Sequence, residues 1–475
     1  MILKGYLFSI LYGVVCLLLA AILHKAGAAK RITRKVVHIL VGFEWVILYC
    51  FVGASYHFLI VCLVFLSLLI VVYKKRLMPM IESDGDNAPG TVYYAVAMSI
   101  MATVMLFVPK MILPFGIGVF CTSVGDGLAG LVGQSVPSKI NPKVYGDKSL
   151  VGAIVNAVAC LGVAMIFSSY FNMGIGTFGC LAIAVLALEL ELFTTRGLDN
   201  VTITLGTAFL SFALCNFEFI WNYIVPILLT PVLVAFVQKK RALDLGGTVC
   251  ALILDLFVSV SLGNAGFLIL LSFLVFGLIT DKIKKCADKS GQSERRGFVQ
   301  VFSNGGVAAV FSVAFLLSRN EAFVVGFCAS LAEALADTAS SGVGAFSKKN
   351  YDIFRFKKCN VGESGGMSVV GTFAGFCGAS VISLLCYALD LIGWKEVLIV
   401  ASVGFVGCVF DSFLGSVFQV KFKCSVCGKT VERRTHCGVP ALYLRGVKFV
   451  GNSFVNLSST VFSGVLGLVL FLFEN

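Results

Sequence analysis

The sequence contains few charged residues. Only 13% of its 475 residues are Asp, Glu, Lys or Arg, whereas 58% are hydrophobic and the mean hydropathy is +0.96. Soluble domains carry about 25% charged residues, so this composition excludes a soluble globular enzyme and a disordered chain. Acidic residues are the scarcer kind, with 25 Asp and Glu against 37 Lys and Arg, which gives a net charge of +12. We therefore predict an integral membrane protein.

The pattern of cysteine and of positive charge excludes two further classes. Most of the 17 Cys residues stand singly within apolar segments, where cysteine acts as a small hydrophobic residue, so a disulfide-stapled secreted domain is excluded. Nucleic-acid binding requires positive charge that clusters on one solvated face. The Lys and Arg residues are instead spread over many loops, and we expect no nucleic-acid partner.

About sixteen stretches are apolar and, at roughly 20 residues each, long enough to cross about 30 Å of hydrocarbon as helices. The stretches near residues 208 and 329 are shorter or carry polar groups, so either is also compatible with a re-entrant segment. The predicted fold class is all-α, a polytopic bundle of transmembrane helices. The centres of the stretches lie near residues 14, 45, 65, 100, 121, 160, 183, 208, 228, 253, 272, 308, 329, 377, 407 and 463.

The positions of Lys and Arg predict the topology. If every stretch spans the membrane, all of these residues except Lys4, Lys110, Arg319 and Lys395 fall in loops on one side. Loops rich in Lys and Arg are cytoplasmic, so we expect these loops inside and both termini outside. We expect a multi-pass protein of the bacterial plasma membrane. The first stretch also resembles a cleavable signal peptide, but its near-spanning length and the heavier positive charge after it favour a retained helix.

Polar motifs recur in the same order on either side of a basic linker at 238–241. We interpret the chain as two tandem, related membrane domains, 1–238 and 239–475, and the second includes a Cys- and His-containing cytoplasmic loop at 421–448. Each motif falls at the predicted cytoplasmic side, so we expect one catalytic face in each half. The paired motifs are Arg34, Lys35, His38 and Gly42 with Arg296, Gln300, Asn304 and Gly305; Asp126 and Gly133 with Asp337 and Gly344; Lys148, Ser149 and Gly152 with Ser368 and Gly371; Glu189 or Glu191 with Asp411; and Asp199 and Asn200 with Asn452 and Asn456.

Carboxylates near a membrane are costly unless they have a partner, a metal ion or water, so these acidic residues are functional candidates. Mg²⁺ fits them, because it takes oxygen ligands and commonly binds one or two carboxylates together with substrate phosphates. Asn200, Asn452 and Asn456 add neutral oxygens. Helix capping is the alternative explanation for each Asp and Asn. The catalytic candidates are Asp126, His38, Lys148, Glu189, Asp199, Asp337 and Asp411, and the Mg²⁺ candidates among them are Asp126, Asp199, Asp337 and Asp411.

Glycine-rich segments and basic residues also suggest an anion site. Glycines around Asp126 and in the run 362–371 let backbone N–H groups approach a phosphate, and Lys148 offers a point charge, although glycine also mediates helix packing in lipid. His38 lies four residues after Arg34 on one face of a helix, where it could act as a base for an alcohol, bind phosphate or be structural. The nucleotide-binding candidates are Arg34, Lys35, Gly133, Ser149, Asn200, Gln300, Asn304, Gly365, Gly366, Ser368, Asn452 and Asn456.

A basic loop contains Cys424, Cys427, His436 and Cys437. The string CSVCGK is typical of the first knuckle of a zinc ribbon, so these residues are candidate ligands of a structural Zn²⁺. Adjacent His436 and Cys437 are awkward as simultaneous ligands, and a reduced loop without metal is the alternative.

Residues 1 to about 238 resemble the phytol kinase and dolichol kinase group of polyprenol kinases. The matching strings are RKVVHILVG (34–42), GTVYY (90–94), GDGLAGLVG (125–133), KSLVG (148–152) and Glu189 followed by Asp199, Asn200, Val201 and Thr202. Gly130 stands where phytol kinases commonly carry a second Asp. This resemblance implies phosphorylation of a long-chain isoprenoid alcohol by a nucleoside triphosphate, often CTP.

Residues from about 242 onward resemble the integral membrane family that includes phytyl-phosphate kinase. The matching strings are RGFVQVFSNGG (296–306), LADTASSGVG (335–344), VGESGGMSVVG (361–371), DSFLGSVFQ (411–419) and GNSFVNLSS (451–459). Ser341 stands where that family usually has Glu, and Gly451 and Ser453 replace an acidic neighbour of Asn452.

Together the resemblances imply a fused isoprenoid-salvage enzyme, in which the first half makes a prenyl monophosphate and the second half a diphosphate. Its expected partners are an isoprenoid alcohol and its monophosphate, membrane lipids, Mg²⁺ and CTP or another nucleoside triphosphate. Cytidylyl transfer to a lipid phosphate is an alternative reaction. A lipid transporter or flippase is an alternative of another class, because transporters also have duplicated halves, although their substrate sites lie near the middle of the bilayer.

Overall fold

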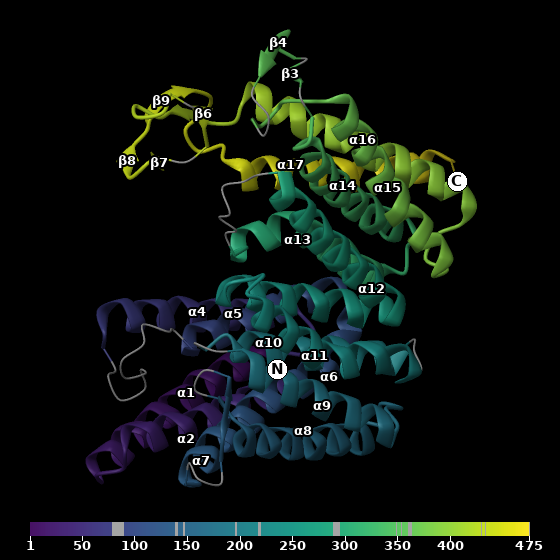
Figure 1. The fold of residues 1–475 in the computed structure, drawn as a ribbon. Helices are drawn as coiled ribbons and strands as arrows, with labels where there is room; N and C mark the ends of the chain where they lie inside the picture. The colour runs from purple at the N-terminus through teal and green to yellow at the C-terminus, as the bar shows by residue number, and fades with distance from the viewer. Residues whose placement is uncertain are drawn as a thin grey trace. The chain divides into compact units, whose positions relative to one another are not determined.

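The chain folds almost entirely into helices, which form two compact units, Met1–Ile227 and Leu228–Asn475 (Figure 1). The computed structural model describes residues 1–77, 90–137, 141–145, 148–194, 197–216, 220–287, 295–347, 349–352, 354–359, 363–428, 430–432 and 434–474. Gly362, the first residue of the expected glycine-rich run, and Val361, which begins the matching string at 361–371, lie outside the described residues.

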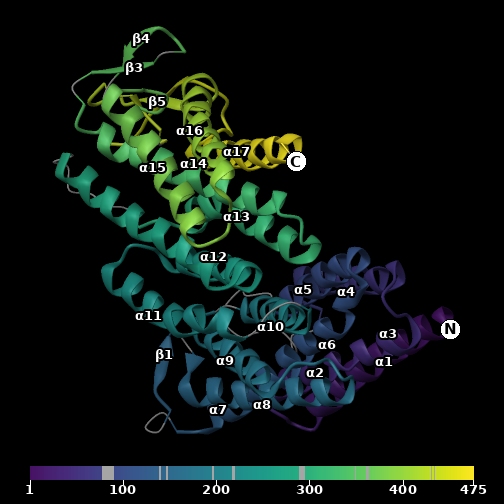
Figure 2. The same ribbon diagram turned by 90° about the vertical axis from the view of Figure 1, so that its right-hand side faces the viewer.

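The first unit is a helical bundle with one short β-hairpin, and Figure 2 shows its helices from a second direction. In chain order it contains α1 (Ile2–Lys25), α2 (Lys30–Gly42), α3 (Glu44–Phe51), α4 (Tyr56–Lys75), α5 (Gly90–Phe107), η1 (Pro109–Met111), α6 (Ile112–Phe120), η2 (Cys121–Asp126), α7 (Gly127–Ser135), β1 (Lys143–Tyr145), β2 (Lys148–Ser149), α8 (Leu150–Tyr170), α9 (Thr177–Phe193), α10 (Asp199–Asn216), η3 (Ile220–Tyr223) and the start of α11 (Ile224–Lys240).

The second unit combines long helices with a hairpin and a small β-rich loop. After α11 it contains α12 (Leu245–Ala287), α13 (Phe298–Ser318), α14 (Ala322–Gly344), β3 (Asn350–Asp352), β4 (Lys357–Cys359), α15 (Val369–Ala388), α16 (Trp394–Val417), β5 (Lys421–Lys423), β6 (Thr430–Val431), β7 (Thr435–His436), β8 (Val439–Pro440), β9 (Leu442–Arg445) and α17 (Asn452–Glu474). Helix α12 consists of two helices that meet at Gly263, whose φ of 60° is left-handed.

The predicted all-α membrane fold is confirmed. Within the described residues, 12 helical segments are long and apolar enough to cross a membrane. The sequence count of about sixteen is higher for two reasons. It divides α12 at its kink, and it includes the stretches near residues 45, 183 and 208, which lie on α2 and α3, α9 and α10. Helices suit these apolar stretches because every backbone N–H and C=O group finds its partner within the segment.

The segment η1–α6–η2–α7 forms the buried centre of the first unit. It packs against α10, α8 and α2, and most of its apolar residues are buried. Small residues permit this close approach, since a Cβ atom at Gly118 would collide with the backbone of Thr204 on α10. The stretch Cys121–Asp126 is a π-helix. Such wide turns interrupt α-helices mainly at functional sites, and here the turn ends at a carboxylate.

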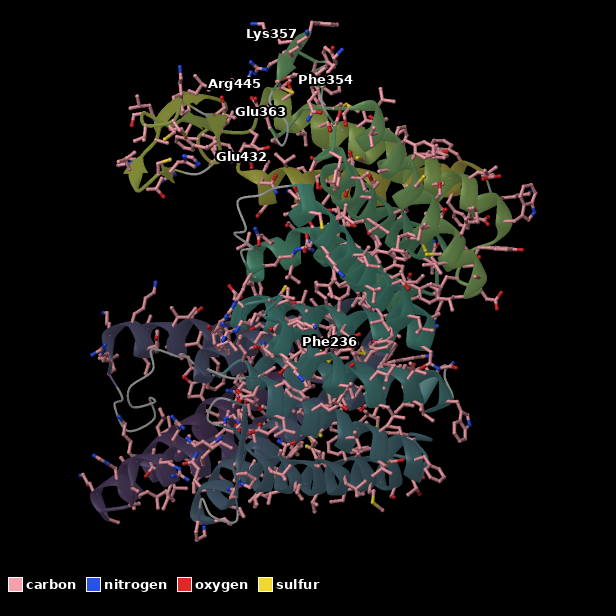
Figure 3. All side chains as sticks on the ribbon, viewed as in Figure 1. Phe236, Phe354, Lys357, Glu363, Glu432 and Arg445 are labelled. Carbon is pink, nitrogen blue, oxygen red and sulfur yellow. The ribbon has the colours of Figure 1, made fainter. Side chains whose placement is uncertain are left out.

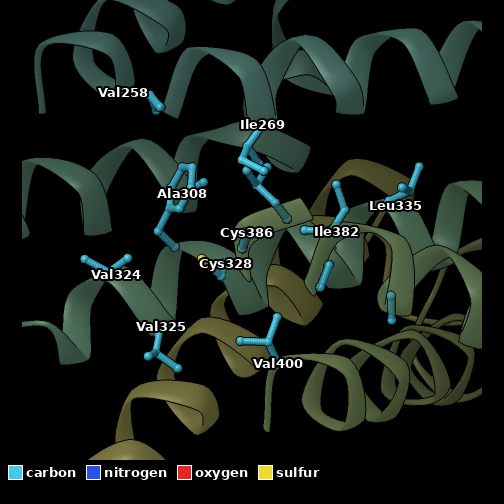
Figure 4. Packing of buried hydrophobic residues seen from close by; sticks show 14 of the residues in the cluster. Val258, Ile269, Ala308, Val324, Val325, Cys328, Leu335, Ile382, Cys386 and Val400 are labelled. Carbon is cyan, nitrogen blue, oxygen red and sulfur yellow. The ribbon is translucent and has the colours of Figure 1, made fainter. Parts of the chain in front are cut away.

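Helix α14 has the same central role in the second unit. It packs against α12, α13, α15, α16 and α17, and most of its residues are buried. Around it lies a hydrophobic core to which Phe327, Leu331, Ile382 and Val400 contribute, and Figure 4 shows this packing from close by. The centre of the helix is thereby held rigidly, and its carboxylates are held with it.

Both units begin a helix in the same way. The antiparallel hairpin β1–β2 leads into α8, where the Ser149 side chain accepts a hydrogen bond from the backbone N–H of Gly152. The antiparallel hairpin β3–β4 precedes α15, where Ser368 accepts the corresponding bond from Gly371. Serine is a preferred N-cap residue, so both candidates act at least as helix caps.

Candidate functional site

Three carboxylates from distant parts of the first unit converge. Asp126 ends the π-helix, Glu191 lies in the last turn of α9, and Asp199 begins α10. One oxygen from each of the three lies within 4.8 Å of the others, and all three side chains are buried. Like charges at this separation repel one another, so the cluster requires cations to be stable.

Lys148 and Lys35 supply positive charge to this cluster. The Lys148 Nζ lies 2.7 Å from Glu191 Oε1 and also donates a hydrogen bond to Asp199. Burial alone would lower the pKa of Lys148, but the charges of Asp199 and Glu191 outweigh it and raise that pKa above its usual value. The Lys35 Nζ lies 2.8 Å from both carboxylate oxygens of Asp126. Both lysines are therefore held at the cluster by contacts with its carboxylates.

His38 is held on the other side of Asp126. Its Nε2 lies 3.4 Å from Asp126 Oδ2 and 3.3 Å from the carbonyl oxygen of Thr122. Both neighbours only accept hydrogen bonds when Asp126 is ionised, so Nε2 carries the proton. In a neutral imidazole the lone pair is then on Nδ1. The ring also packs edge-on against Tyr94, with 5.3 Å between the centroids, so its orientation is fixed.

The donor atoms of the cluster suit a divalent cation. Mg²⁺ takes oxygen ligands at about 2.0–2.1 Å, so its ligand oxygens lie within about 4.2 Å of one another. The three carboxylates approach this spacing. Glu191 Oε2 and Asn200 Oδ1 are buried and have no hydrogen-bond partner among the described residues, as expected for oxygens that bind a ligand. The residues therefore fit Mg²⁺.

Two glycines make room for the charged side chains. A Cβ atom at Gly130 would collide with Cε of Lys35, so the absence of a side chain there lets the lysine reach Asp126. A Cβ atom at Gly133 would lie 2.8 Å from Cα of Gly152, so α7 and α8 can meet only through glycine. Gly133 is thus a packing residue in this structure.

The sequence-based candidates of the first half divide into two groups. Asp126, Asp199, Lys148, Lys35 and His38 come together in the cluster. Glu189 is buried on α9, but the glutamate that reaches Lys148 is Glu191, two residues further on. The sequence ELEL in the last two turns of this apolar helix offers both glutamates, and the pattern alone does not distinguish them.

The remaining candidates of the first half lie at the edge of the cluster. Asn200 donates a hydrogen bond from Nδ2 to the carbonyl oxygen of Gly90, 3.0 Å away, and so links α10 to the start of α5. Arg34 lies on α2, half-buried, directly before Lys35. Arg31, which is not among the sequence-based candidates, donates to the carbonyl oxygen of Gly130 at 3.0 Å. A basic edge on α2 therefore flanks the carboxylates.

A second acidic cluster lies in the second unit. Glu333 and Asp337 are one turn apart on α14, and Asp411 on α16 lies within electrostatic range of both. Ser459 on α17 donates a hydrogen bond to Asp411 Oδ2 at 3.2 Å. Glu333 is 1% exposed, and its Oε1 has no hydrogen-bond partner in the part of the chain that the structure describes. The signal for Glu333 was a second acid four residues before Asp337 on an apolar helix.

Two asparagines join the helices beside this cluster. Asn456 on α17 donates from Nδ2 to Asn304 Oδ1 on α13 at 3.1 Å. Gln300 accepts a hydrogen bond from the backbone N–H of Gly297 at the start of α13, so its observed role is capping. Asn452 is the first residue of α17.

The glycines of the segment before α15 have structural reasons of their own. Gly365 has a φ of +80°, and a Cβ atom there would lie 2.5 Å from the backbone nitrogen of Ser416. The N–H of Gly366 donates to the carbonyl oxygen of Glu363 at 3.0 Å and closes a turn. The segment is therefore a tight loop held against the end of α16.

Comparisons with known proteins agree with a membrane protein of this type. Residues 228–464 match the family described as "Integral membrane protein DUF92". An uncharacterized membrane protein of Methanocaldococcus jannaschii is 28% identical over 52% of this chain and 93% of its own length. A phytol kinase of Synechocystis is 30% identical over 38% of this chain and 79% of its own length.

A plant protein is also related. The chloroplastic protein VTE6 of Arabidopsis thaliana is 26% identical over 42% of this chain and 62% of its own length. No solved structure matches the chain. The matches show that this chain is a member of an integral membrane family that is described as DUF92 over residues 228–464 and that has phytol kinase among its homologues.

Proposed function

We propose that the protein is a membrane-embedded isoprenoid alcohol kinase, whose first unit transfers the terminal phosphoryl group of a nucleoside triphosphate to a phytol-like alcohol. The observation that carries this proposal is the convergence of Asp126, Glu191 and Asp199 with Lys148 and Lys35. The relative named phytol kinase supports a phosphotransferase that acts on an isoprenoid alcohol. CTP is the expected donor, on the resemblance alone.

The arrangement of charge suits phosphoryl transfer. This reaction needs positioning and charge stabilisation more than covalent chemistry from the protein. Lys148 and Lys35 are fixed cations that can neutralise phosphate oxygens, and the basic edge of α2 can guide an anion toward them. The alcohol enters from the bilayer and the nucleotide from water, so the site has to lie at the boundary between the two.

The proposed step forms one bond and breaks another. The alcohol oxygen bonds to the terminal phosphorus while the bond from that phosphorus to the nucleoside diphosphate oxygen breaks, and the electron pair leaves with the diphosphate. The hydroxyl proton passes to Nδ1 of His38, whose Nε2–H is held by Asp126 and Thr122. A buried, oriented imidazole is well suited to accept one proton and return it to water.

Mg²⁺ is the proposed cofactor, held by Asp126, Glu191 and Asp199. When bound, it supplies positive charge that neutralises the donor phosphates. Lys148 contacts two of these carboxylates, so in this proposal it would neutralise phosphate oxygens beside the cation. The three carboxylates then keep their positions because α9, α10 and the π-helix hold them.

We propose that the second unit phosphorylates the monophosphate to the diphosphate. Glu333, Asp337 and Asp411 supply carboxylates for Mg²⁺ there, and the resemblance to phytyl-phosphate kinase supports this substrate. In the proposal both sites open to the cytoplasm, so a poorly soluble monophosphate can pass between them along one face of the membrane.

The position of the label in the nucleotide tests the reaction type. Purified protein is incubated with phytol or other prenols and with CTP labelled on the terminal phosphate or, separately, on the α-phosphate. The proposal predicts label in the lipid from terminally labelled CTP only. Lipid label from α-labelled CTP would instead indicate cytidylyl transfer, and nucleotide-independent uptake of lipid by proteoliposomes, without any labelled product, would indicate a transporter.

A further inference from the structure

The β-rich loop between α16 and α17 contains a cluster of thiol and imidazole groups that the proposed phosphoryl transfer does not use. Strands β6, β5 and β9 form a three-stranded antiparallel sheet, and β7 and β8 form a hairpin beside it. The sulfurs of Cys424, Cys427 and Cys437 and a ring nitrogen of His436 all lie within 4.8 Å of one another. All three cysteines are free thiols.

Two distances in this cluster are close to those of a tetrahedral site. The Nδ1 atom of His436 lies 3.5 Å from the sulfur of Cys427 and 3.2 Å from that of Cys437. Tetrahedral zinc has Zn–S distances of about 2.3 Å and Zn–N distances of about 2.0–2.1 Å, which place neighbouring ligand atoms about 3.5–3.8 Å apart. The adjacent residues His436 and Cys437 therefore reach one point together, although their spacing in the sequence is awkward.

Two tight turns arrange the four donors. In the turn CSVCG, the N–H of Gly428 donates to the carbonyl oxygen of Cys424 at 3.0 Å, and Gly428 has a φ of +69°. Cys437 and Gly438 have φ values of +52° and +75°, so the second turn is left-handed at both positions. A left-handed non-glycine residue is costly, and metal coordination by its side chain offsets that cost. Two ligand-bearing turns that face each other are the usual frame of a zinc ribbon.

We infer that this loop binds one structural Zn²⁺ through Cys424, Cys427, His436 and Cys437. Three thiolates and one imidazole complete a tetrahedral shell, so the site is closed and takes no substrate. Thiolate ligands select zinc over magnesium, which separates this site chemically from the carboxylate clusters. Coordination releases the thiol protons to solvent and requires no oxidant.

The bound ion would brace the second unit. Zinc fixes the loop from which β5 extends, and β5 begins with Lys421, which is 1% exposed. The Nζ of Lys421 donates to the carbonyl oxygen of Ser364 at 2.6 Å, and Lys421 and Arg445 each lie 3.4 Å from Glu363 Oε1. Figure 3 labels Glu363 and Arg445. The sheet therefore supports the tight loop that precedes α15. An effect of zinc on phosphorylation by the second unit rests on the proposed function of that unit, whereas zinc binding itself does not.

Metal analysis of the full-length protein in detergent tests the inference. The purified protein should contain about one zinc ion per chain, as a closed four-ligand site requires. Cys424→Ser and Cys427→Ser should reduce the zinc content at least about tenfold, since each removes a ligand. The matched control is Cys286→Ser, because Cys286 is also an exposed thiol of the second unit but lies outside the cluster. Equal zinc in all variants, or no zinc in the unmodified protein after purification with added zinc, would overturn it.

A cobalt titration keeps the test independent of how well the variants fold. The unmodified protein, stripped with a chelator, should bind one Co²⁺ with the visible absorption of a tetrahedral thiolate complex, and zinc should displace it. Octahedral cobalt spectra, or a Cys427–Cys437 disulfide found by thiol titration, would contradict the site. Loss of zinc should also lower monophosphate phosphorylation; if zinc binds as described and no phosphorylation occurs at all, the proposed function fails while the zinc site stands.

Discussion

The Lys148 Nζ lies 2.7 Å from Glu191 Oε1, although 43 residues separate the two in the chain. This contact joins the hairpin before α8 to the last turn of α9, and Asp199 at the start of α10 shares the same lysine. The hairpin before α8, the last turn of α9 and the start of α10 are thereby held together by charge. Because burial of one unpaired partner is costly, the contact ties the geometry of the site to the stability of the unit.

The choice between two neighbouring glutamates gives the first prediction. Glu191→Gln should lower kcat for alcohol phosphorylation more than Glu189→Gln, because Glu191 contacts Lys148 and lies in the carboxylate cluster. The expected difference is about 10-fold or more, as for removal of a charged group from a preorganised site. Steady-state rates of the two purified variants measure it. A larger loss in Glu189→Gln would assign the site to the wrong face of α9.

The space around Lys35 gives the second prediction. Gly130→Ala should lower activity about 10- to 100-fold, because its Cβ atom would displace the Lys35 side chain from Asp126. The Tm should fall as well, because Asp126 would stay buried without its cation. Gly162→Ala is the matched control: it adds the same methyl group on α8, where a Cβ atom meets nothing within 4 Å. Equal rates for both variants would show that Lys35 is not needed.

The charge balance of the first unit gives the third prediction, which does not depend on activity. Lys148→Met should lower the Tm in detergent, because it leaves Glu191 and Asp199 buried without their cation. Breaking a buried ion pair costs about 3–5 kcal/mol. Added Mg²⁺ should raise the Tm of this variant more than that of the unmodified protein, since the ion restores the missing charge. Lys110→Met, at an exposed position, should behave as the unmodified protein does, and an equal response to Mg²⁺ in all three proteins would count against a cation at the carboxylates.

The second acidic cluster gives the fourth prediction. Asp337→Asn should leave alcohol phosphorylation intact and let the prenyl monophosphate accumulate, because it removes a carboxylate from the proposed second site only. Thin-layer separation of labelled lipids measures the ratio of monophosphate to diphosphate. Asp390→Asn is the control, since Asp390 is exposed in the turn after α15. Undiminished diphosphate in Asp337→Asn would remove that residue from the second step.

The sequence predicts much of the fold and part of the site, for physical reasons. Long apolar runs have few options in a bilayer, so the helical bundle follows from hydropathy. Asp126, Lys148 and Asp199 stand out because charge inside or beside apolar helices needs a reason. Periodicity alone does not decide which of Glu189 and Glu191 turns inward. The choice depends on how α9 packs.

The sequence also left the adjacent residues His436 and Cys437 undecided. Their convergence depends on positive φ values at Cys437 and Gly438. A positive φ is common for glycine, but residue type does not predict one at Cys437. Glu333 is not predicted from the sequence for another reason: it lies on an apolar helix with no basic neighbour in the sequence, and the fold brings it near Asp411.

A labelling assay with two variants tests whether a lipid alcohol is phosphorylated at the Asp126 cluster. Unmodified protein, Asp126→Asn and Glu44→Gln are each incubated in lipid vesicles with phytol, Mg²⁺ and terminally labelled CTP, ATP or GTP. Glu44 is a buried carboxylate of the same unit outside the cluster, and it serves as the control. We predict labelled prenyl phosphate from the unmodified protein and from Glu44→Gln, and a loss of at least about 100-fold in Asp126→Asn. No lipid label from any nucleotide, or full activity in Asp126→Asn, would exclude alcohol phosphorylation at this cluster.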